Sequence, residues 1–327
     1  MNFWKVYDVG MPEDICDFKF ENKRGYRVGG DIHTKKCSMS YGDVVTFPKI
    51  LEAWNDFVSG KRKREDVNEF ATHLMDNLLV LFDELKNNTY FHGLYEEYVI
   101  CDPKKRVIHK ASVKDRVVHR LLYNALYSYF DKRYIHDSYS CRVGKGAHKA
   151  QARFRHFVDR VSKNYTKQCY VLKFDIKKCF ESIDTEILKS ILIWHVEDER
   201  FKNLLFTVID SFKNGLPLGN LTSQLFINIY LHELDWYCKQ TLKVCHYLRY
   251  ADDVIIVSGD KKYLEKLHQS MAFFIAQELH LETHKKVISS VYSGVDVLGL
   301  VFFQKYERLR RSTERRKKRR ESAALKW

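Results

Sequence analysis

Three aspartates have the residue type and spacing that could do chemistry on phosphate groups. Asp252 and Asp253 are adjacent, within a Tyr-Ala-Asp-Asp sequence that separates the apolar runs 245–249 and 254–257. Asp175 ends an apolar run of its own. We predict a strand, a tight turn and a strand around the adjacent pair, with Asp175 at the end of a neighbouring strand. Such carboxylates could bind two Mg²⁺ ions, which hold both oxygens of an in-line phosphoryl transfer.

These residues also have ordinary interpretations. An aspartate at the end of a strand is often a turn residue or a helix cap. The adjacent pair, however, places like charges side by side, and a bound cation is the usual remedy for that repulsion. Phe180, five residues after Asp175, could simply pack in the core. Beside a metal-bound triphosphate, its ring would instead crowd the sugar 2′ position and exclude ribonucleotides.

The segment 215–224, Gly-Leu-Pro-Leu-Gly-Asn-Leu-Thr-Ser-Gln, is the second part of the predicted site. Its glycines let the backbone approach a ligand closely, and its polar residues can cap the helix that follows. Taken alone, the segment is an ordinary loop–helix junction. Between the two carboxylate strands it becomes a nucleotide and template platform, with Leu218, Gly219 and Gln224 as candidate nucleotide contacts.

Two basic segments could bind phosphates. Lys104 and Arg106 could hold triphosphate oxygens, with Lys105 as an equally plausible partner, although a solvated turn is the simpler interpretation. Arg142 and Lys145 lie in a glycine-containing loop that suits a template backbone and equally suits an exposed surface loop. The residue types alone leave both choices open.

The composition favours a polyanionic partner. The 327-residue chain is 45% hydrophobic, enough for a sizeable core, and its net charge is +14. Residues 305–320 hold ten Lys or Arg and two Glu, and could contact nucleic acid or form a solvated end. The eight cysteines form no Cys-x-x-Cys pair, and no signal peptide or membrane-length apolar run is visible. We expect reduced thiols, a cytoplasmic protein and no membrane association.

Hydrophobic periodicity predicts the elements that must position these residues. Helices are expected from residue 64 to 88, over 117–130, after a cap at Asp184, from 220 to about 240 and over 263–279. Strands are expected at 170–175, 245–250, 254–258 and 297–303. This order predicts an α+β fold with an antiparallel centre.

Together these motifs resemble those of reverse transcriptases. The Tyr-Ala-Asp-Asp sequence is similar to their YxDD box, residues 174–180 to the first catalytic strand, and 215–224 to the substrate-pocket loop. Residues 297–302 resemble the strand that grips the primer end, and 104–108 resemble part of the fingers that holds the incoming triphosphate. The resemblance covers roughly residues 60–304, and its motifs are specific as a set although none is decisive singly.

The resemblance implies a right-hand polymerase fold with fingers, an antiparallel-sheet palm and a truncated or minimal thumb. The implied division is an N-terminal extension of unknown role at 1–60, fingers at 61–165, a palm at 166–304 and a basic tail or vestigial thumb at 305–327. The implied activity is RNA-directed DNA polymerase. Its partners would be an RNA template, a DNA or RNA primer and dNTPs.

The same resemblance assigns roles to residues. Asp175, Asp252 and Asp253 would be catalytic and, with Ile176, would hold two Mg²⁺ ions, for which Mn²⁺ could substitute. Lys104, Arg106, Phe180, Leu218, Gly219 and Gln224 would bind the nucleotide. Arg142, Lys145, Tyr250, Leu298 and Gly299 would bind template or primer. Lys285 or Lys286 is a candidate general acid near the leaving pyrophosphate.

One subfamily matches best. Primer-extending retroviral and intron enzymes usually carry Gln where this chain has Leu218, and Ser-Pro where it has Ser223-Gln224. The sequence Leu-Gly-Asn-Leu-Thr-Ser-Gln resembles reverse transcriptases of diversity-generating retroelements. That resemblance implies error-prone copying with adenines miscopied, and a small helical accessory protein. A phage-defence or other domesticated bacterial reverse transcriptase is the alternative of the same class.

The C-terminal part departs from the family pattern. About 23 residues follow Gln304, too few for a full helical thumb, so we expect a short basic helix on the duplex, or a docking segment, and poor processivity. An RNA-binding, maturase-like splicing cofactor is the alternative of another class. The same shortness and the complete set of aspartates argue against it.

Overall fold

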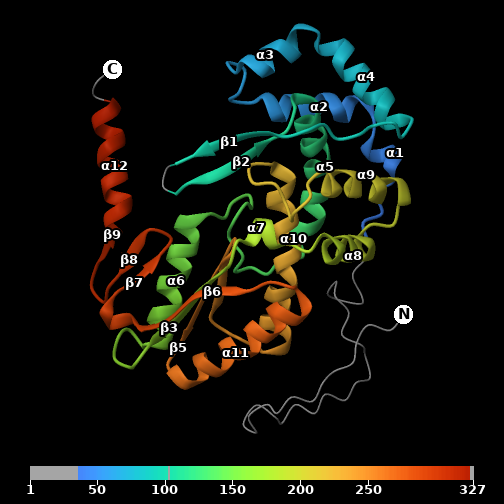
Figure 1. The fold of residues 1–327 in the computed structure, drawn as a ribbon. Helices are drawn as coiled ribbons and strands as arrows, with labels where there is room; N and C mark the ends of the chain where they lie inside the picture. The colour runs from blue at the N-terminus through green and yellow to red at the C-terminus, as the bar shows by residue number, and fades with distance from the viewer. Residues whose placement is uncertain (1–35, 102–103, 325–327) are drawn as a thin grey trace, which may run out of the picture.

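The computed structural model describes residues 36–101 and 104–324, and Figure 1 shows two parts joined side by side. A helical part carries a two-stranded hairpin, and a second part is built on a four-stranded sheet. The helical part contains α1 (Tyr41–Val44), α2 (Phe47–Val58), α3 (Glu65–Thr72), α4 (Leu74–Lys86), β1 (Glu96–Ile100), β2 (Arg106–Lys110) and α5 (Val113–Asp131).

Residues 41–58, which were expected to be an extension of unknown role, belong to the core of the helical part. Ile50, Trp54 and Phe57 recur at helical spacing on α2, and all three are buried. Trp54 stacks on Phe70 of α3, with ring centroids 5.3 Å apart. The helices α1 and α2 are therefore part of the same hydrophobic core as α4 and α5.

The helix predicted from residue 64 to 88 is two helices. α3 ends at Thr72 and α4 begins at Leu74, because His73 takes a non-helical conformation with φ −121° and ψ 43°. The apolar spacing continues across this break, so periodicity alone could not reveal it. Asn87 ends α4 as expected.

The antiparallel centre is confirmed as a sheet with the strand order β4-β5-β3-β6. Its strands are β3 (Tyr170–Ile176), β4 (Tyr247–Tyr250), β5 (Asp253–Ser258) and β6 (Thr283–Ser290). One face, with Leu172, Phe174 and Ile256, packs against the helices α8, α10 and α11. The other face, with Val171 and Ile255, packs against α6 and the small sheet β7-β8-β9. Both faces are covered at β3 and β5, which explains the apolar runs in these two strands.

The elements around this sheet are mostly helical. The helix capped by Asp184 is confirmed, since its side chain accepts hydrogen bonds from the backbone N–H of Glu186 and Ile187. The helices predicted at 220–240 and 263–279 are also present. The elements are α6 (Ala147–Val161), α7 (Cys179–Ser182), α8 (Thr185–His195), α9 (Glu199–Asp210), α10 (Leu221–Trp236), which continues as a π-helical turn (Tyr237–Thr241), and α11 (Lys261–Glu278).

The strand predicted at 297–303 is a hairpin instead. β7 (Val295–Val297) and β8 (Leu300–Phe302) pair across Leu298 and Gly299, which have φ of 51° and 92°. Two consecutive positive φ angles are typical of the two-residue turns that join antiparallel strands. β9 (Glu307–Leu309) completes the small sheet, and α12 (Arg311–Ala324) stands beside it at the edge of the molecule (Figure 1).

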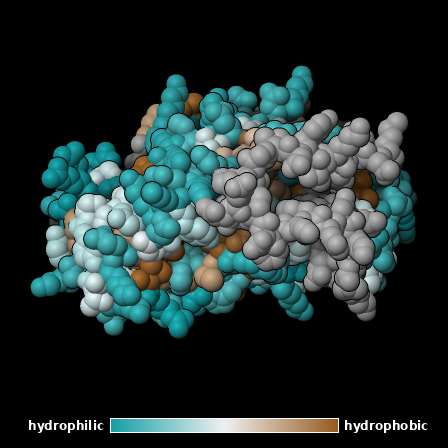
Figure 2. Space-filling model, turned by 90° about the horizontal axis from the view of Figure 1, so that it is seen from below, coloured by the Kyte–Doolittle hydropathy of each residue, from teal (hydrophilic) through white to brown (hydrophobic). Residues whose placement is uncertain are grey.

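No helix among the described residues is long and apolar enough to cross a membrane. The coloured part of the surface in Figure 2 is largely hydrophilic, with apolar residues in separate small groups. The seven cysteines within the described ranges are all free thiols.

Candidate active site

The adjacent aspartates lie at a two-residue β-turn, where Asp252 is in the turn and Asp253 begins β5. Tyr250 pairs with Asp253 at the ends of β4 and β5, so Ala251 and Asp252 form the turn between them. Ala251 has φ 53°, a left-handed conformation that costs a residue with a Cβ about 1 kcal/mol. Such strain is found where the surrounding structure over-determines the backbone, often at functional sites.

Asp175 lies beside this turn. β3 pairs with β5 so that Phe174 faces Val254, which places Asp175 next to Asp253 across the ladder. Burial raises the pKa of Asp252, and the carboxylates of Asp253 and Asp175 raise it further. Burial also raises the pKa of Asp253, and the nearby Lys173 opposes that rise. The fold thus gathers three mutually repelling carboxylates.

Two lysines approach these carboxylates. Lys285 Nζ lies 3.9 Å from Asp175 Oδ2, and Lys173 Nζ lies 4.0 Å from Asp253 Oδ1. Lys285 has φ 51° and belongs to a β-bulge in β6, opposite the step from Lys173 to Asp175. Bulges beside active sites commonly redirect a side chain, and here the bulge coincides with the approach of Lys285 to Asp175.

The donor set suits a hard divalent cation, although the side chains are not arranged around one. Asp175 Oδ1 is buried without a hydrogen-bond partner, which leaves a charged oxygen available to an ion. As they stand, no three His, Cys, Asp or Glu side chains in the described ranges form a group that could hold a metal. The Ile176 side chain is apolar and buried, so its backbone carbonyl is the atom it could contribute.

Phe180 touches the substrate-pocket loop. The Leu216 N–H donates to the Phe180 carbonyl at 2.7 Å. Gly215 has φ 66°, and a Cβ at this position would lie 2.3 Å from the same carbonyl oxygen. Glycine is therefore required at position 215. Its lack of a Cβ lets the loop pack against Phe180 of α7, which follows Asp175 by five residues.

Leu218 and Gly219 lie against the strand β2. The His109 N–H donates to the Leu218 carbonyl at 3.0 Å, and a Cβ on Gly219 would lie 2.7 Å from Ile108 Cγ2. Arg106, at the start of β2, is exposed, and its charge lowers the pKa of Asp252. β2 thus places predicted nucleotide contacts beside the carboxylates.

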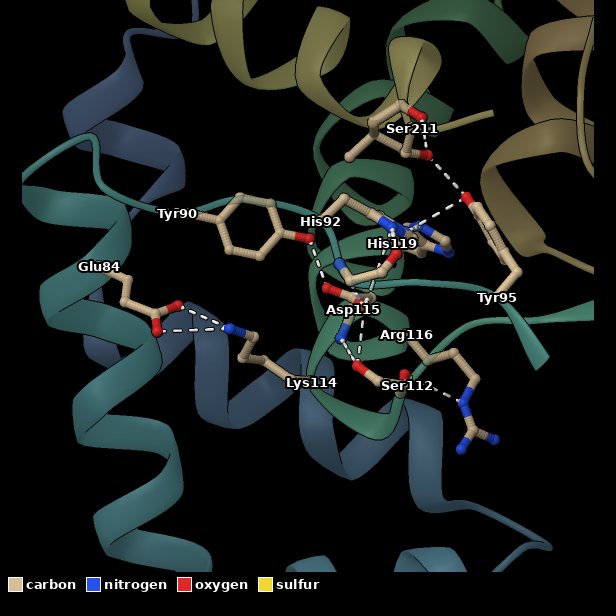
Figure 3. A network of polar contacts seen from close by, with 12 residues as sticks. Glu84, Tyr90, His92, Tyr95, Ser112, Lys114, Asp115, Arg116, His119 and Ser211 are labelled. Atoms are coloured by element: carbon tan, nitrogen blue, oxygen red, sulfur yellow. Dashed lines mark hydrogen bonds and ion pairs between the residues drawn. The ribbon is translucent and has the colours of Figure 1, made fainter. Parts of the chain in front are cut away.

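A buried polar network anchors the hairpin β1–β2 to its surroundings (Figure 3). Asp115 on α5 accepts hydrogen bonds from the hydroxyl of Tyr90 at 2.8 Å and from Ser112 at 2.7 Å. Tyr95, just before β1, makes a 2.7 Å hydrogen bond to Ser211 at the end of α9. The chain from α9 leads directly into the pocket loop, so the network fixes the hairpin and the loop relative to one another.

Other predicted contacts have different surroundings. Lys104 is exposed, beside the undescribed residues 102–103. Arg142 donates to Asp131 and to the backbone carbonyls of Ile135 and Ser138, and its side chain is only 7% exposed. Its guanidinium therefore shapes the loop from inside instead of facing a template. Lys145 Nζ donates to the His136 carbonyl at 2.8 Å.

The remaining predicted contacts are Gln224, Tyr250, Leu298 and Gly299. Gln224 is exposed on α10, and its Oε1 lies 3.5 Å from Cys141 Sγ. Tyr250 is half-buried at the end of β4. Leu298 accepts a hydrogen bond from Gln151 at 3.2 Å, and the Gly299 carbonyl accepts one from the Arg310 N–H at 2.9 Å.

Sequence reasoning missed three residues next to the carboxylates: Lys173, Arg249 and Asp296. Lys173 also donates to the Asp296 carbonyl at 3.1 Å and so joins the palm sheet to β7. Arg249 is completely buried below the turn. A signal was available in the sequence, because a lysine and an arginine interrupt strands that are otherwise apolar.

The chain is similar in sequence to known proteins. The model of a family described as reverse transcriptase (RNA-dependent DNA polymerase) matches residues 101–302. The protein YkfC of Escherichia coli is 23% identical over 63% of this chain and 65% of its own length. The group II intron-encoded protein LtrA of Lactococcus lactis is 20% identical over 62% of this chain and 45% of its own length.

A putative COX1/OXI3 intron 2 protein of Saccharomyces cerevisiae is 23% identical over 42% of this chain, and the chain spans 24% of it. Thus the chain spans less than two thirds of the length of each of these relatives. Among solved structures, apo telomerase from Candida tropicalis has a TM-score of 0.48, with 16% identity over 73% of this chain and 60% of that one. The family match covers more than half of the chain, and the chain therefore belongs to the reverse transcriptase family.

Proposed function

We propose that this protein is an RNA-directed DNA polymerase that uses two metal ions. The observation that carries the proposal is the register of the sheet, which places Asp175 beside the turn that presents Asp252 and Asp253. Divalent ions are general among reverse transcriptases, and oxygen ligands of this kind suit Mg²⁺. When bound there, two Mg²⁺ ions would stabilise the attacking and leaving oxygens of nucleotidyl transfer.

The side chains around the carboxylates have distinct roles in this proposal. Asp175, Asp252 and Asp253 hold the charge that the ions require. Phe180 is proposed to exclude a 2′-hydroxyl with its ring, and the support is the hydrogen bond between its carbonyl and the pocket loop. Arg106 binds triphosphate oxygens from β2, and its charge already acts on Asp252.

Lys285 is the proposed proton donor to the leaving pyrophosphate. Its ammonium lies beside Asp175, on the bulge of β6. A group at this place would act after the carboxylates have positioned the triphosphate. The proposed template and primer contacts are Lys145, Tyr250 and the turn Leu298-Gly299, while Arg142 holds the loop that carries Lys145.

The first test is primer extension on a defined RNA template with Mg²⁺ and all four dNTPs. We expect extension by the wild-type protein and a loss of at least 100-fold in Asp252→Asn, since one carboxylate ligand becomes a neutral amide. Asp76→Asn, an exposed aspartate at the start of α4, is the matched control and should extend normally. Equal extension by wild type and Asp252→Asn would contradict the proposal.

A melting curve without divalent ions shows whether Asp252→Asn is folded. The pKa of Asp252 is raised in the fold, so its ionised form is disfavoured there and costs stability as the pH rises through that pKa. At pH 7.5 the neutral Asn removes this cost. Asp252→Asn should therefore melt no lower than the wild type, and lost activity would then be a defect of the site.

We further propose that copying is error-prone, as in a diversity-generating retroelement. Leu218 offers the nucleotide pocket an apolar side chain where a Gln could form hydrogen bonds, so discrimination between correct and wrong pairs should weaken. In Leu218→Gln we expect errors opposite template adenine to fall about tenfold, as measured by sequencing the products. An unchanged error rate opposite adenine would contradict this role for Leu218. Accurate copying by the wild type would favour a defence or intron-derived role instead.

A further inference from the structure

The fully buried guanidinium of Arg249 has every donor occupied. Its Nε and Nη2 donate to the two carboxylate oxygens of Asp235 at 2.8 and 2.7 Å. Nη1 donates to Asn228 Oδ1 at 3.2 Å and to the Ala251 carbonyl at 2.9 Å. Nη2 also donates to Ser138 Oγ at 3.3 Å. These five bonds exhaust the five N–H donors of an arginine.

This ion pair is unusual in its burial. The side chains of Arg249 and Asp235 are both 0% exposed. A buried ion pair is weak evidence for stability, because desolvating two charges offsets much of their attraction. Well-packed apolar residues often fill such a space at less cost, and the other contacts of this pair give it a role that apolar residues would lack.

That further contact is the backbone of the catalytic turn. The Ala251 carbonyl is the backbone atom that Arg249 binds, and Ala251 is the residue held at φ 53° immediately before Asp252. Arg249 therefore joins a rigid helix, through Asp235 and Asn228 of α10, to the turn that carries a metal-binding carboxylate. Neutral packing residues could not provide this hydrogen bond.

We propose that the pair Arg249–Asp235 positions the left-handed turn and so fixes the carboxylate of Asp252 for metal binding. This inference rests on the proposed function of the site. Arg249 touches no reacting atom and is a positioning residue. Groups that orient a metal ligand without touching the metal typically change metal affinity about 10- to 100-fold when they are removed.

The test is a Mn²⁺ titration of the protein without nucleotide, in which free Mn²⁺ is measured by electron paramagnetic resonance. Arg249→Lys keeps a charge opposite Asp235, but an ammonium cannot reproduce the fork that reaches the carboxylate and the Ala251 carbonyl together. We expect a folded variant whose Kd for Mn²⁺ rises about tenfold or more. Its kcat should fall with little change in KM for dNTP, because the proposed triphosphate contacts lie on β2.

A second variant guards against misfolding. Arg249→Met combined with Asp235→Leu and Tyr247→Phe removes both charges together with the hydroxyl that donates to Asp235 at 2.6 Å. Replacing a whole buried pair by apolar residues is often neutral for stability. We expect a melting temperature near that of the wild type with weakened Mn²⁺ binding.

Lys189→Met is the matched control. It removes pairs with Glu186 and Asp210, neither of which belongs to the turn, and should leave Mn²⁺ affinity unchanged. A folded Arg249 variant that binds Mn²⁺ as the wild type does would overturn the inference. Unfolding of both Arg249 variants would also overturn it, because the pair would then serve stability. If instead wild type and Asp252→Asn bind Mn²⁺ equally weakly, the proposed function itself fails.

Discussion

At the scale of single residues, direct contacts between backbone atoms decide where the predicted site residues lie. Phe180 is in place because the pocket loop hydrogen-bonds to its carbonyl, and Gly215 is required because no Cβ fits against that carbonyl. The Leu218 carbonyl accepts a hydrogen bond from β2, which fixes the backbone of Leu218 and leaves its side chain free of that contact. Backbone contacts thus fix where these residues lie.

Phe180→Ala should relax the selection of deoxynucleotides. In the proposed role of Phe180, removing the ring opens space next to the sugar, so we expect incorporation of ribonucleotides relative to deoxynucleotides to rise about 10-fold or more, in the range that one apolar contact usually provides. The measurement is kcat/KM for a dNTP and its rNTP in single-nucleotide extension. Phe273→Ala, on an exposed position of α11, is the control and should keep the wild-type ratio. An unchanged ratio in Phe180→Ala would assign the ring to packing alone.

At the scale of secondary-structure elements, charge is concentrated in one helix. α12 carries most of the basic residues of the segment 305–320, and Figure 1 shows it at the edge of the molecule beside the small sheet. Its charge far exceeds what its own pairs Lys317–Glu321 and Lys318–Glu314 neutralise. Its residues are mainly exposed, so the helix presents this charge to the solvent instead of burying an apolar face.

Arg311 and Arg315 are exposed one helical turn apart on α12. Replacing both by Gln should weaken binding to a primer–template duplex uniformly across sequences, because phosphate contacts do not read bases. A plot of the logarithm of the association constant against the logarithm of the salt concentration has a negative slope. In the variant this slope should become less steep by about 2, roughly one for each phosphate that the helix no longer neutralises. Lys261→Gln with Lys262→Gln, at the exposed start of α11, is the control. An unchanged slope in the α12 variant would mean that this face of the helix does not contact phosphate.

At the scale of the whole molecule, the two parts are joined by buried polar groups as well as by apolar packing. The network of Figure 3 ties α5 to the chain before β1 and to the end of α9. His119 belongs to it, since its Nε2 lies 3.0 Å from His92 Nε2. On α10, His232 is likewise buried. The family membership and this α+β architecture together give the right-hand polymerase fold.

Buried neutral histidines predict that the protein loses stability in mild acid. Burial lowers the pKa of His119 to about 3 and that of His232 to about 4, from an ordinary value of 6.5. The unfolded chain binds protons first, so this stability is complete above pH 6.5 and is lost as the pH falls towards 4. A histidine whose pKa is lower by one in the folded protein than in the unfolded chain adds about 1.4 kcal/mol to the free energy of unfolding above pH 6.5. We expect a falling free energy of unfolding in urea between pH 7.5 and 4.5.

The variant His119→Gln should flatten this pH dependence, because the amide does not titrate. His148→Gln, which alters a histidine near the start of α6, should leave the dependence as it is in the wild type. An equal loss of stability in His119→Gln and the wild type would exclude His119 as a source of acid lability.

The sequence by itself determined the elements with a regular local signal. The strands at 170–175 and 254–258, the turn with its two aspartates and the helix capped by Asp184 were all predicted, because period, capping and turn chemistry depend on near neighbours. The break at His73 and the turn at Leu298-Gly299 were not, since the apolar pattern runs through both. The hairpin β1–β2 and α6 were also missed.

Only the tertiary structure decided which groups meet around the carboxylates. Arg249 bonds to partners 14 and 111 residues away, and Arg142 turned inward although its sequence suggested an exposed basic loop. Lys285 approaches Asp175 across a bulge that no spacing predicts. The physical reason is that a buried or half-buried charged side chain pairs with the polar groups that the packing of the fold brings near it. The local sequence sets which charges exist, and the fold sets which of them touch.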